Sequence, residues 1–122
     1  MVCYPALLAR AAQRDPHNRA GQLAVAYNSL GDYYQMTYQF QTAIELFQNG
    51  AAVAKNTAEK AYSLYSISSC YSTMGDEPDK VREYAEAVLA LPNLSPGDRR
   101  IGEGLLGRSR NISAQRSMAM GQ

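Results

Sequence analysis

The segment 27–47 constrains the fold of this chain more than any other part of the sequence. Aromatic, small and aliphatic residues occur in it at the spacing of two helices joined by a turn: Tyr27, Leu30, Gly31, Tyr34, Ala43 and Phe47. Steps of three and four residues place such a set along one side of a helix. One pair of helices cannot bury its apolar side alone, so we expect further helices with a similar pattern along the chain.

The order of these residues resembles the tetratricopeptide repeat, in which W-x2-L-G-x2-Y is followed by A-x3-F, with Tyr27 here in place of Trp. A second, weaker copy begins 37 residues later with the segment 64–71 and closes at Pro92. Lys80 stands in this copy where the first copy has Ala43, and this departure leaves the register of the second helix pair open.

The resemblance implies an all-α fold, in which antiparallel helix-turn-helix repeats stack as a short right-handed α-solenoid. We expect one repeat domain over residues 1–110, followed by a flexible C-terminal tail over 111–122. The expected parts of the domain are a preceding half-repeat or cap at 1–16, a first repeat at 20–55, a second repeat at 57–92 and a terminal capping helix at 95–110. The start inside a half-repeat leaves two interpretations open, an excised piece of a longer protein or an atypical cap.

Hydrophobic periodicity predicts five helices after residue 19. They cover residues 20–37, 40–54, 57–74, 78–91 and 96–110. Gly31 lies on the apolar side of the first helix, where glycine costs about 1 kcal/mol relative to alanine, so we expect it to let the partner helix come close. The glycines at 102, 104 and 107 predict a last helix that is stable only when it is packed.

Composition excludes several classes of protein. No apolar run approaches the roughly 20 residues of a membrane span, and the first residues lack the features of a signal peptide, so we expect a cytoplasmic protein with no membrane partner. Cys3 and Cys70 belong to no cluster with metal-ligand spacing, and we expect two structural thiols, no metal and no cofactor.

Residues suited to catalysis are few and scattered. The only histidine, His17, lies in a predicted turn, and the acidic residues at 76–86 fall at the start and outer face of a helix, where they complement its dipole. The three glycines at 102, 104 and 107 have phosphate-loop spacing but follow a predicted helix start instead of a strand. We therefore expect no enzyme activity.

The resemblance places a binding groove on the first helix of each repeat, beside its packing side. Carried over position by position, the groove residues are Asn28, Asp32, Gln35, Met36, Tyr62, Tyr65, Ser69, Ser72 and Arg99. Relatives that clamp a terminal carboxylate carry a cation and an amide where this chain has Asn28 and Asp32, so we expect no such clamp. Tyrosine offers apolar area and a polar tip at low entropic cost, which makes Tyr62 and Tyr65 the expected anchors. The alternative is that both rings only cover the last helix.

These observations favour a protein-interaction scaffold that binds a protein or peptide segment in the groove. An alternative is a structural segment of a longer solenoid, or a unit that self-associates through exposed leucines of its terminal helices, at 7 and 8 and at 105 and 106. A third interpretation is binding of an anionic partner or nucleic acid through residues 98–122, whose charge balance is +3 against −2 for the rest. We do not expect nucleic-acid binding, because the net charge is only +1 and the arginines lack interleaved aromatic residues.

Overall fold

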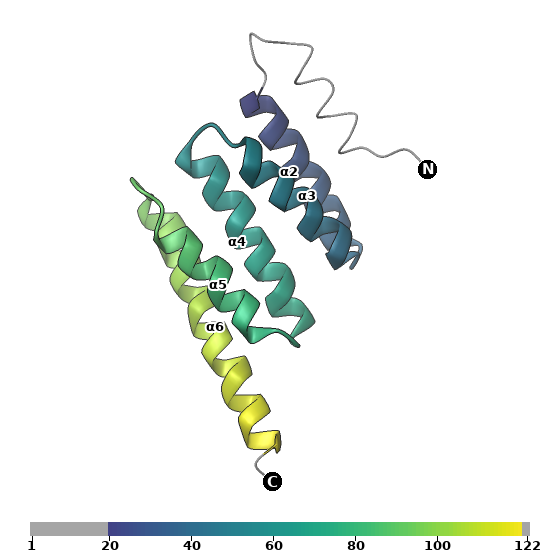
Figure 1. The fold of residues 1–122 in the computed structure, drawn as a ribbon, viewed down its shortest axis with the longest axis vertical. Helices are drawn as coiled ribbons and strands as arrows, with labels where there is room; N and C mark the ends of the chain where they lie inside the picture. The colour runs from purple at the N-terminus through teal and green to yellow at the C-terminus, as the bar shows by residue number, and fades with distance from the viewer. Residues whose placement is uncertain (1–19, 121–122) are drawn as a thin grey trace.

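The computed structural model describes residues 20–120, and this part of the chain is all-α (Figure 1). Its five helices are α2 (Ala20–Met36), α3 (Phe40–Val53), α4 (Thr57–Met74), α5 (Pro78–Leu89) and α6 (Pro96–Met120). Each helix packs antiparallel against the next one along the chain. Among the described residues no helix is long and apolar enough to cross a membrane.

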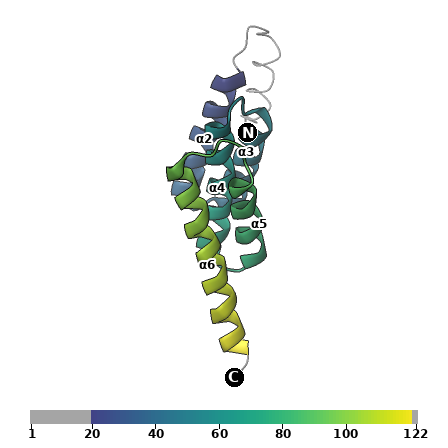
Figure 2. The ribbon, with the colours of Figure 1, turned by 90° about the vertical axis from the view of Figure 1, so that its left-hand side faces the viewer.

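The helices form two layers. Figure 2 shows α2, α4 and α6 on one side of the molecule and α3 and α5 on the other. Besides its sequence neighbours α3 and α5, α4 also contacts α2 and α6. The first layer is therefore a continuous surface of three helices with α4 at its centre.

The core lies between the layers. Phe47 of α3 is fully buried against Ile67 and Cys70 of α4, and Tyr27 of α2 packs with Leu46 of α3. The burial of Cys70 agrees with the structural role predicted for this thiol.

Gly31 confirms the predicted close approach of α2 and α3. A Cβ atom at this position would lie 2.7 Å from Cε1 of Phe47, which is closer than a side chain can come without moving the ring. Gly102 has a similar place in α6, where a Cβ atom would lie 3.0 Å from Cδ2 of Leu89 on α5. Both glycines thus lie at close contacts between neighbouring helices.

Local signals explain where the central helices begin and end. Asn56 caps α4 by accepting a hydrogen bond from the Glu59 amide at 2.9 Å. Gly75 closes α4 with φ of 76°, a left-handed conformation that favours glycine. Pro78 occupies the first turn of α5, where its missing N–H has no helical partner to lose.

The sequence predicted the helix bounds closely for α2 to α5 and wrongly for α6. This helix continues to Met120, so its predicted end at residue 110 is wrong, and 111–120 of the predicted tail are helical. The physical reason is that 111–120 contain neither glycine nor proline, and that Arg116 Nη1 donates a hydrogen bond to the Asp76 carbonyl at 2.7 Å. The cap predicted at 1–16, together with Cys3 and His17, lies outside the described residues.

The expectation that Leu105 is exposed for self-association is also wrong, because its side chain is 6% exposed. Other buried residues lie outside the apolar set predicted for 27–47, among them Ile44 and Leu46. A helix in two layers contacts neighbours on more than one side, whereas the sequence pattern was interpreted as one buried side per helix.

Candidate functional site

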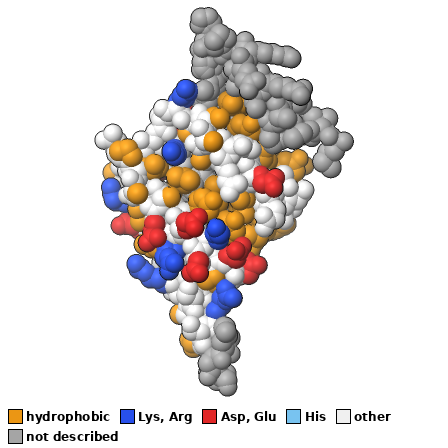
Figure 3. All heavy atoms as spheres, in the orientation of Figure 1, with side chains coloured by type: hydrophobic (Ala, Val, Ile, Leu, Met, Phe, Trp, Pro, Cys, Tyr) orange, Lys and Arg blue, Asp and Glu red, His pale blue; other side chains and the backbone are white. Residues whose placement is uncertain are grey.

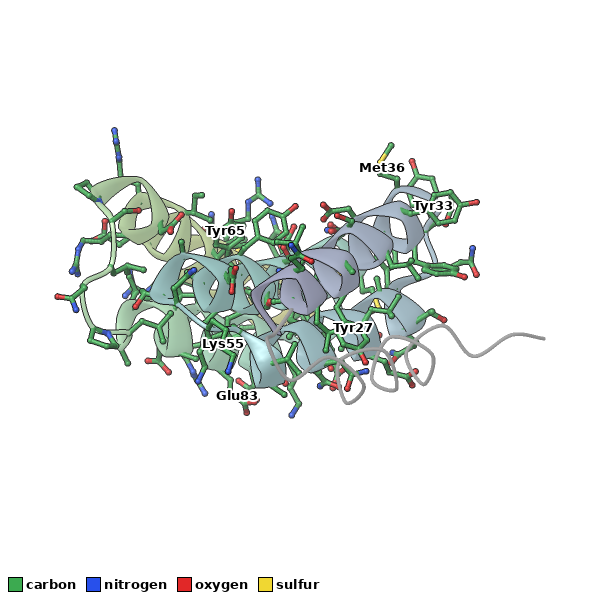
Figure 4. All side chains as sticks on the ribbon, turned by 90° about the horizontal axis from the view of Figure 1, so that it is seen from above. Tyr27, Tyr33, Met36, Lys55, Tyr65 and Glu83 are labelled. Atoms are coloured by element: carbon green, nitrogen blue, oxygen red, sulfur yellow. The ribbon has the colours of Figure 1, made fainter. Side chains whose placement is uncertain are left out.

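A groove of about 450 Å³ runs along the three-helix layer, between α2, α4 and α6. Its lining residues are Asp32, Gln35, Tyr62, Tyr65, Ser66, Ser69, Arg100, Ile101, Gly104, Leu105 and Arg108. Figure 4 shows Tyr65 on the side of the molecule opposite Glu83 of α5, so the groove opens away from the α3–α5 layer. We refer to this groove below as the α2–α4–α6 groove.

The structure brings five of the nine predicted groove residues into the α2–α4–α6 groove. These are Asp32, Gln35, Tyr62, Tyr65 and Ser69. The other four do not line it: Met36 is 78% exposed near the end of α2, Ser72 is half-buried, Arg99 is exposed, and Asn28 is nearly buried.

Asn28 was predicted to line the groove, but the structure places it at the contact between α2 and α4. Its side-chain oxygen accepts a hydrogen bond from the Ser63 hydroxyl at 2.8 Å, so this residue joins α2 to α4. Asn28 also borders a smaller hollow of about 360 Å³, which shares Asp32 and Tyr62 with the main groove. A ligand that extends past Tyr62 would therefore reach the hollow beside Asn28.

Tyr62 and Tyr65 project from α4 at the centre of the groove. Their ring centroids lie 5.2 Å apart, and the Tyr62 hydroxyl donates a hydrogen bond to Asp32 Oδ2 at 2.5 Å. Burial raises the pKa of Tyr62 above its usual range, and the bond to Asp32 raises it further. Burial also raises the pKa of Tyr65, with the negative charges of Asp98 and Asp32 adding to the effect. Both phenols therefore stay protonated at neutral pH.

Hydrogen bonds fix the α2 wall of the groove relative to α4. Gln35 Nε2 donates to the Ser69 hydroxyl at 3.3 Å, one helical turn after Asp32 on α2 and two turns after Tyr62 on α4. Tyr62 and Tyr65 are half-buried and line the groove beside these bonds. A groove wall held in this way loses little conformational freedom when a ligand binds.

The α6 wall contains the residues that sequence reasoning missed: Arg100, Ile101, Gly104, Leu105 and Arg108. The repeat register carried over to α6 predicted Arg99 instead. In α4 the groove residues Tyr62 and Ser69 lie one position after buried residues, whereas Ile101 and Arg108 of α6 lie one position before them. Gly102 is buried against Leu89 of α5, and this contact identifies the side of α6 that faces away from the groove. Spacing alone did not predict the contact.

The face formed by α3 and α5 has a different chemistry. Figure 3, which looks onto this layer, shows acidic and basic side chains gathered in the lower half of the molecule. On α5, Lys80 pairs with Glu83 at 3.8 Å and Arg82 pairs with Asp79 at 3.5 Å. A hollow of about 300 Å³ lies on this side, lined by residues of α3, α4 and α5 that include Lys60 and Tyr84. Exposed ion pairs of this kind are typical of a solvated surface.

The described residues hold no group of histidine, cysteine and acidic side chains that could bind a metal ion. Cys70 is fully buried, and burial raises the pKa of its thiol to about 12, so it is not a reactive nucleophile at neutral pH. The side chains that line the groove offer aromatic contact, hydrogen bonding and charge pairing.

The fold and the groove define a class of protein: an all-α chain of sequentially packed antiparallel helices with a hollow along one layer. Comparison with known proteins adds no narrower identity, since no family model, no curated protein and no solved structure matches this chain.

Proposed function

We propose that this chain is a tetratricopeptide-like interaction module that binds a protein or peptide segment in the α2–α4–α6 groove. The spacing of residues 27–47 supports the repeat assignment, and so does the order of the helices, because the first helix of each proposed repeat lies in one layer. A right-handed solenoid is part of this proposal.

One observation carries the function. Tyr62 and Tyr65, adjacent on α4, lie half-buried at the centre of a groove of about 450 Å³ and are held there by contact with Asp32 and with each other. Tyrosine is enriched among the few residues that dominate binding energy at protein interfaces. The volume is in the range of sites that take a few side chains of a bound segment.

Peptides selected from a random display library against the folded chain would test this proposal. We expect Tyr62→Ala with Tyr65→Ala to weaken binding of the selected peptides by about tenfold or more, because hot-spot tyrosines contribute at least 1 to 2 kcal/mol each. Circular dichroism checks that the variant is folded.

The matched control is Tyr33→Ala with Tyr38→Ala, which removes two tyrosines that are 60% and 78% exposed and outside the groove. The control should bind as the wild type does. Equal binding by the Tyr62 and Tyr65 variant and the wild type would show that the peptides do not use this groove, and an empty selection would contradict the proposal altogether.

A further inference from the structure

We propose that the segment bound in the α2–α4–α6 groove is acidic, and that two of its carboxylate side chains pair with Arg100 and Arg108 on the α6 wall. This inference rests on the peptide-binding function proposed above and adds the chemical class of the ligand. The juxtaposition that carries it is a pair of guanidinium groups facing two tyrosines across a groove.

Arg100 and Arg108 are the basic residues among those that line the groove. Lys80 and Arg82 pair with acidic neighbours on α5, and Arg116 donates to a backbone carbonyl. Neither Arg100 nor Arg108 forms an ion pair with any residue that the structure describes, although both line the groove. Guanidinium groups bind carboxylates through two parallel hydrogen bonds, so two such groups without partners match a ligand with carboxylates.

The opposite wall sets the direction of the ligand. Asp32, on α2, already accepts the Tyr62 hydroxyl bond, and its negative charge remains in the groove. On α6 itself, Asp98 places a negative charge near Tyr65, two residues before Arg100. An acidic side chain facing Asp32 would be repelled, whereas one facing Arg100 or Arg108 would be attracted. We therefore place the acidic edge of the segment along α6 and an uncharged edge along α2.

The spacing of the arginines limits the sequence of the segment. Eight residues along α6 correspond to about 12 Å at 1.5 Å per residue. In an extended peptide, which rises about 3.3 Å per residue, this distance separates side chains about four positions apart. Gly104 lies between the two arginines, and a Cβ atom there would meet nothing within 4 Å. The open surface over Gly104 and Ile101 can take an apolar or aromatic side chain placed between the two acidic ones.

Acidic side chains fit these observations better than two other anionic ligands. A terminal carboxylate supplies one anionic group, which leaves one of the two arginines without a partner. A nucleic acid would bring phosphates to both walls, including that of Asp32, and the net charge of the chain is only +1.

The test uses the whole chain and a fluorescent twelve-residue peptide with two glutamates four positions apart and a phenylalanine between them. Binding is measured by fluorescence anisotropy. We expect Arg100→Ala with Arg108→Ala to weaken binding by about tenfold or more. Arg99→Ala with Arg110→Ala, which removes the same charge from the same helix outside the groove, should change binding by less than about twofold.

Two further arms locate the contact. Replacing both glutamates of the peptide by glutamine should cause the same loss as the Arg100 and Arg108 variant, and amidation of the peptide C-terminus should have no effect. Gly104→Leu should also weaken binding, because a Cβ atom at this position meets nothing within 4 Å and the larger side chain would occupy open space in the groove.

The remaining outcomes would overturn the inference in distinguishable ways. Peptides without acidic residues that bind through Tyr62 and Tyr65 would retain the proposed function and exclude the acidic ligand. Failure of every peptide, selected or designed, would contradict both. A loss on C-terminal amidation would identify a terminal carboxylate as the ligand, and tight binding of a fluorescent oligouridine that needs the same arginines would identify a nucleic acid. Equal losses in the two arginine variants would show attraction by general charge.

Discussion

Gly31 and Phe47 show how single residues set the distance between helices in this molecule. The Phe47 ring is fully buried and lies against the α2 backbone at Gly31, so no free space remains there for a methyl group. Gly107 of α6 is the opposite case, since a Cβ atom there would meet nothing within 4 Å.

We expect Gly31→Ala to lower the free energy of unfolding by about 1 kcal/mol. Overpacking a filled core costs about 1 to 3 kcal/mol, which exceeds the gain of about 1 kcal/mol from replacing glycine in a helix. Gly107→Ala is the matched control and should raise the free energy of unfolding by about 1 kcal/mol. Urea denaturation followed by circular dichroism measures both. An alanine at 31 that stabilises the protein as much as one at 107 would contradict the observed contact.

The site residues differ in how far the sequence could predict them. Tyr62 and Tyr65 were predicted because they lie one position from the buried side of α4, and this offset is visible in the helical period. The place of Asn28 was not predictable in the same way, because it depends on the Ser63 hydroxyl 35 residues further along the chain. Hydrogen bonds between helices have no counterpart in the periodicity of either helix.

At the level of whole helices, the end signals differ in strength. Asn56 caps α4 through its side chain, and Glu59 completes the arrangement by accepting the Lys55 amide at 2.9 Å. Gln39, at the start of α3, makes no such side-chain bond to the helix. The two positions therefore form a natural comparison.

Asn56→Ala should lower the free energy of unfolding by about 1 kcal/mol, because it leaves the Glu59 amide without its cap. Gln39→Ala should change the free energy of unfolding by less than about 0.5 kcal/mol, since no cap is lost. Thermal or urea unfolding of the two variants gives the comparison. The capping account fails if both substitutions have the same effect.

The helices themselves were largely predictable, since α4 begins and ends where caps, glycine and proline mark its ends. The end of α6 was not, because the prediction stopped at Arg110, where the hydrophobic periodicity ends. The helix continues to Met120 through mostly exposed residues, and Arg116 bonds to the Asp76 carbonyl far away in the sequence. The side of α6 that faces the groove depends on its contacts with α4 and α5, which explains why its two groove arginines were missed.

At the scale of the whole molecule, the sequence correctly predicted the all-α class but wrongly predicted that Leu105 is exposed. Because Leu105 is buried, α6 does not expose the pair of leucines, Leu105 and Leu106, through which self-association was predicted. We therefore expect a monomer of 13.4 kDa over a wide range of concentration, as measured by sedimentation equilibrium. A mass that rises toward that of a dimer would instead support the self-associating alternative.

The two-layer arrangement gives the molecule its functional asymmetry. In the α3–α5 layer, exposed charges of α5 form ion pairs with each other. In the α2–α4–α6 groove, half-buried tyrosines lie beside exposed arginines that form no ion pair with a described residue. This contrast is the reason for placing the binding surface on one layer.

The most direct test of peptide binding in the α2–α4–α6 groove is an NMR titration of the isotope-labelled chain with a peptide from the display selection. We predict that the largest amide shift changes fall on residues of the groove, above all on Tyr62, Tyr65, Gly104 and their neighbours. The amides of α5 around Glu83 should stay nearly unchanged. Shift changes concentrated on the α3–α5 layer, or around Tyr38 at the turn between α2 and α3, would contradict the account.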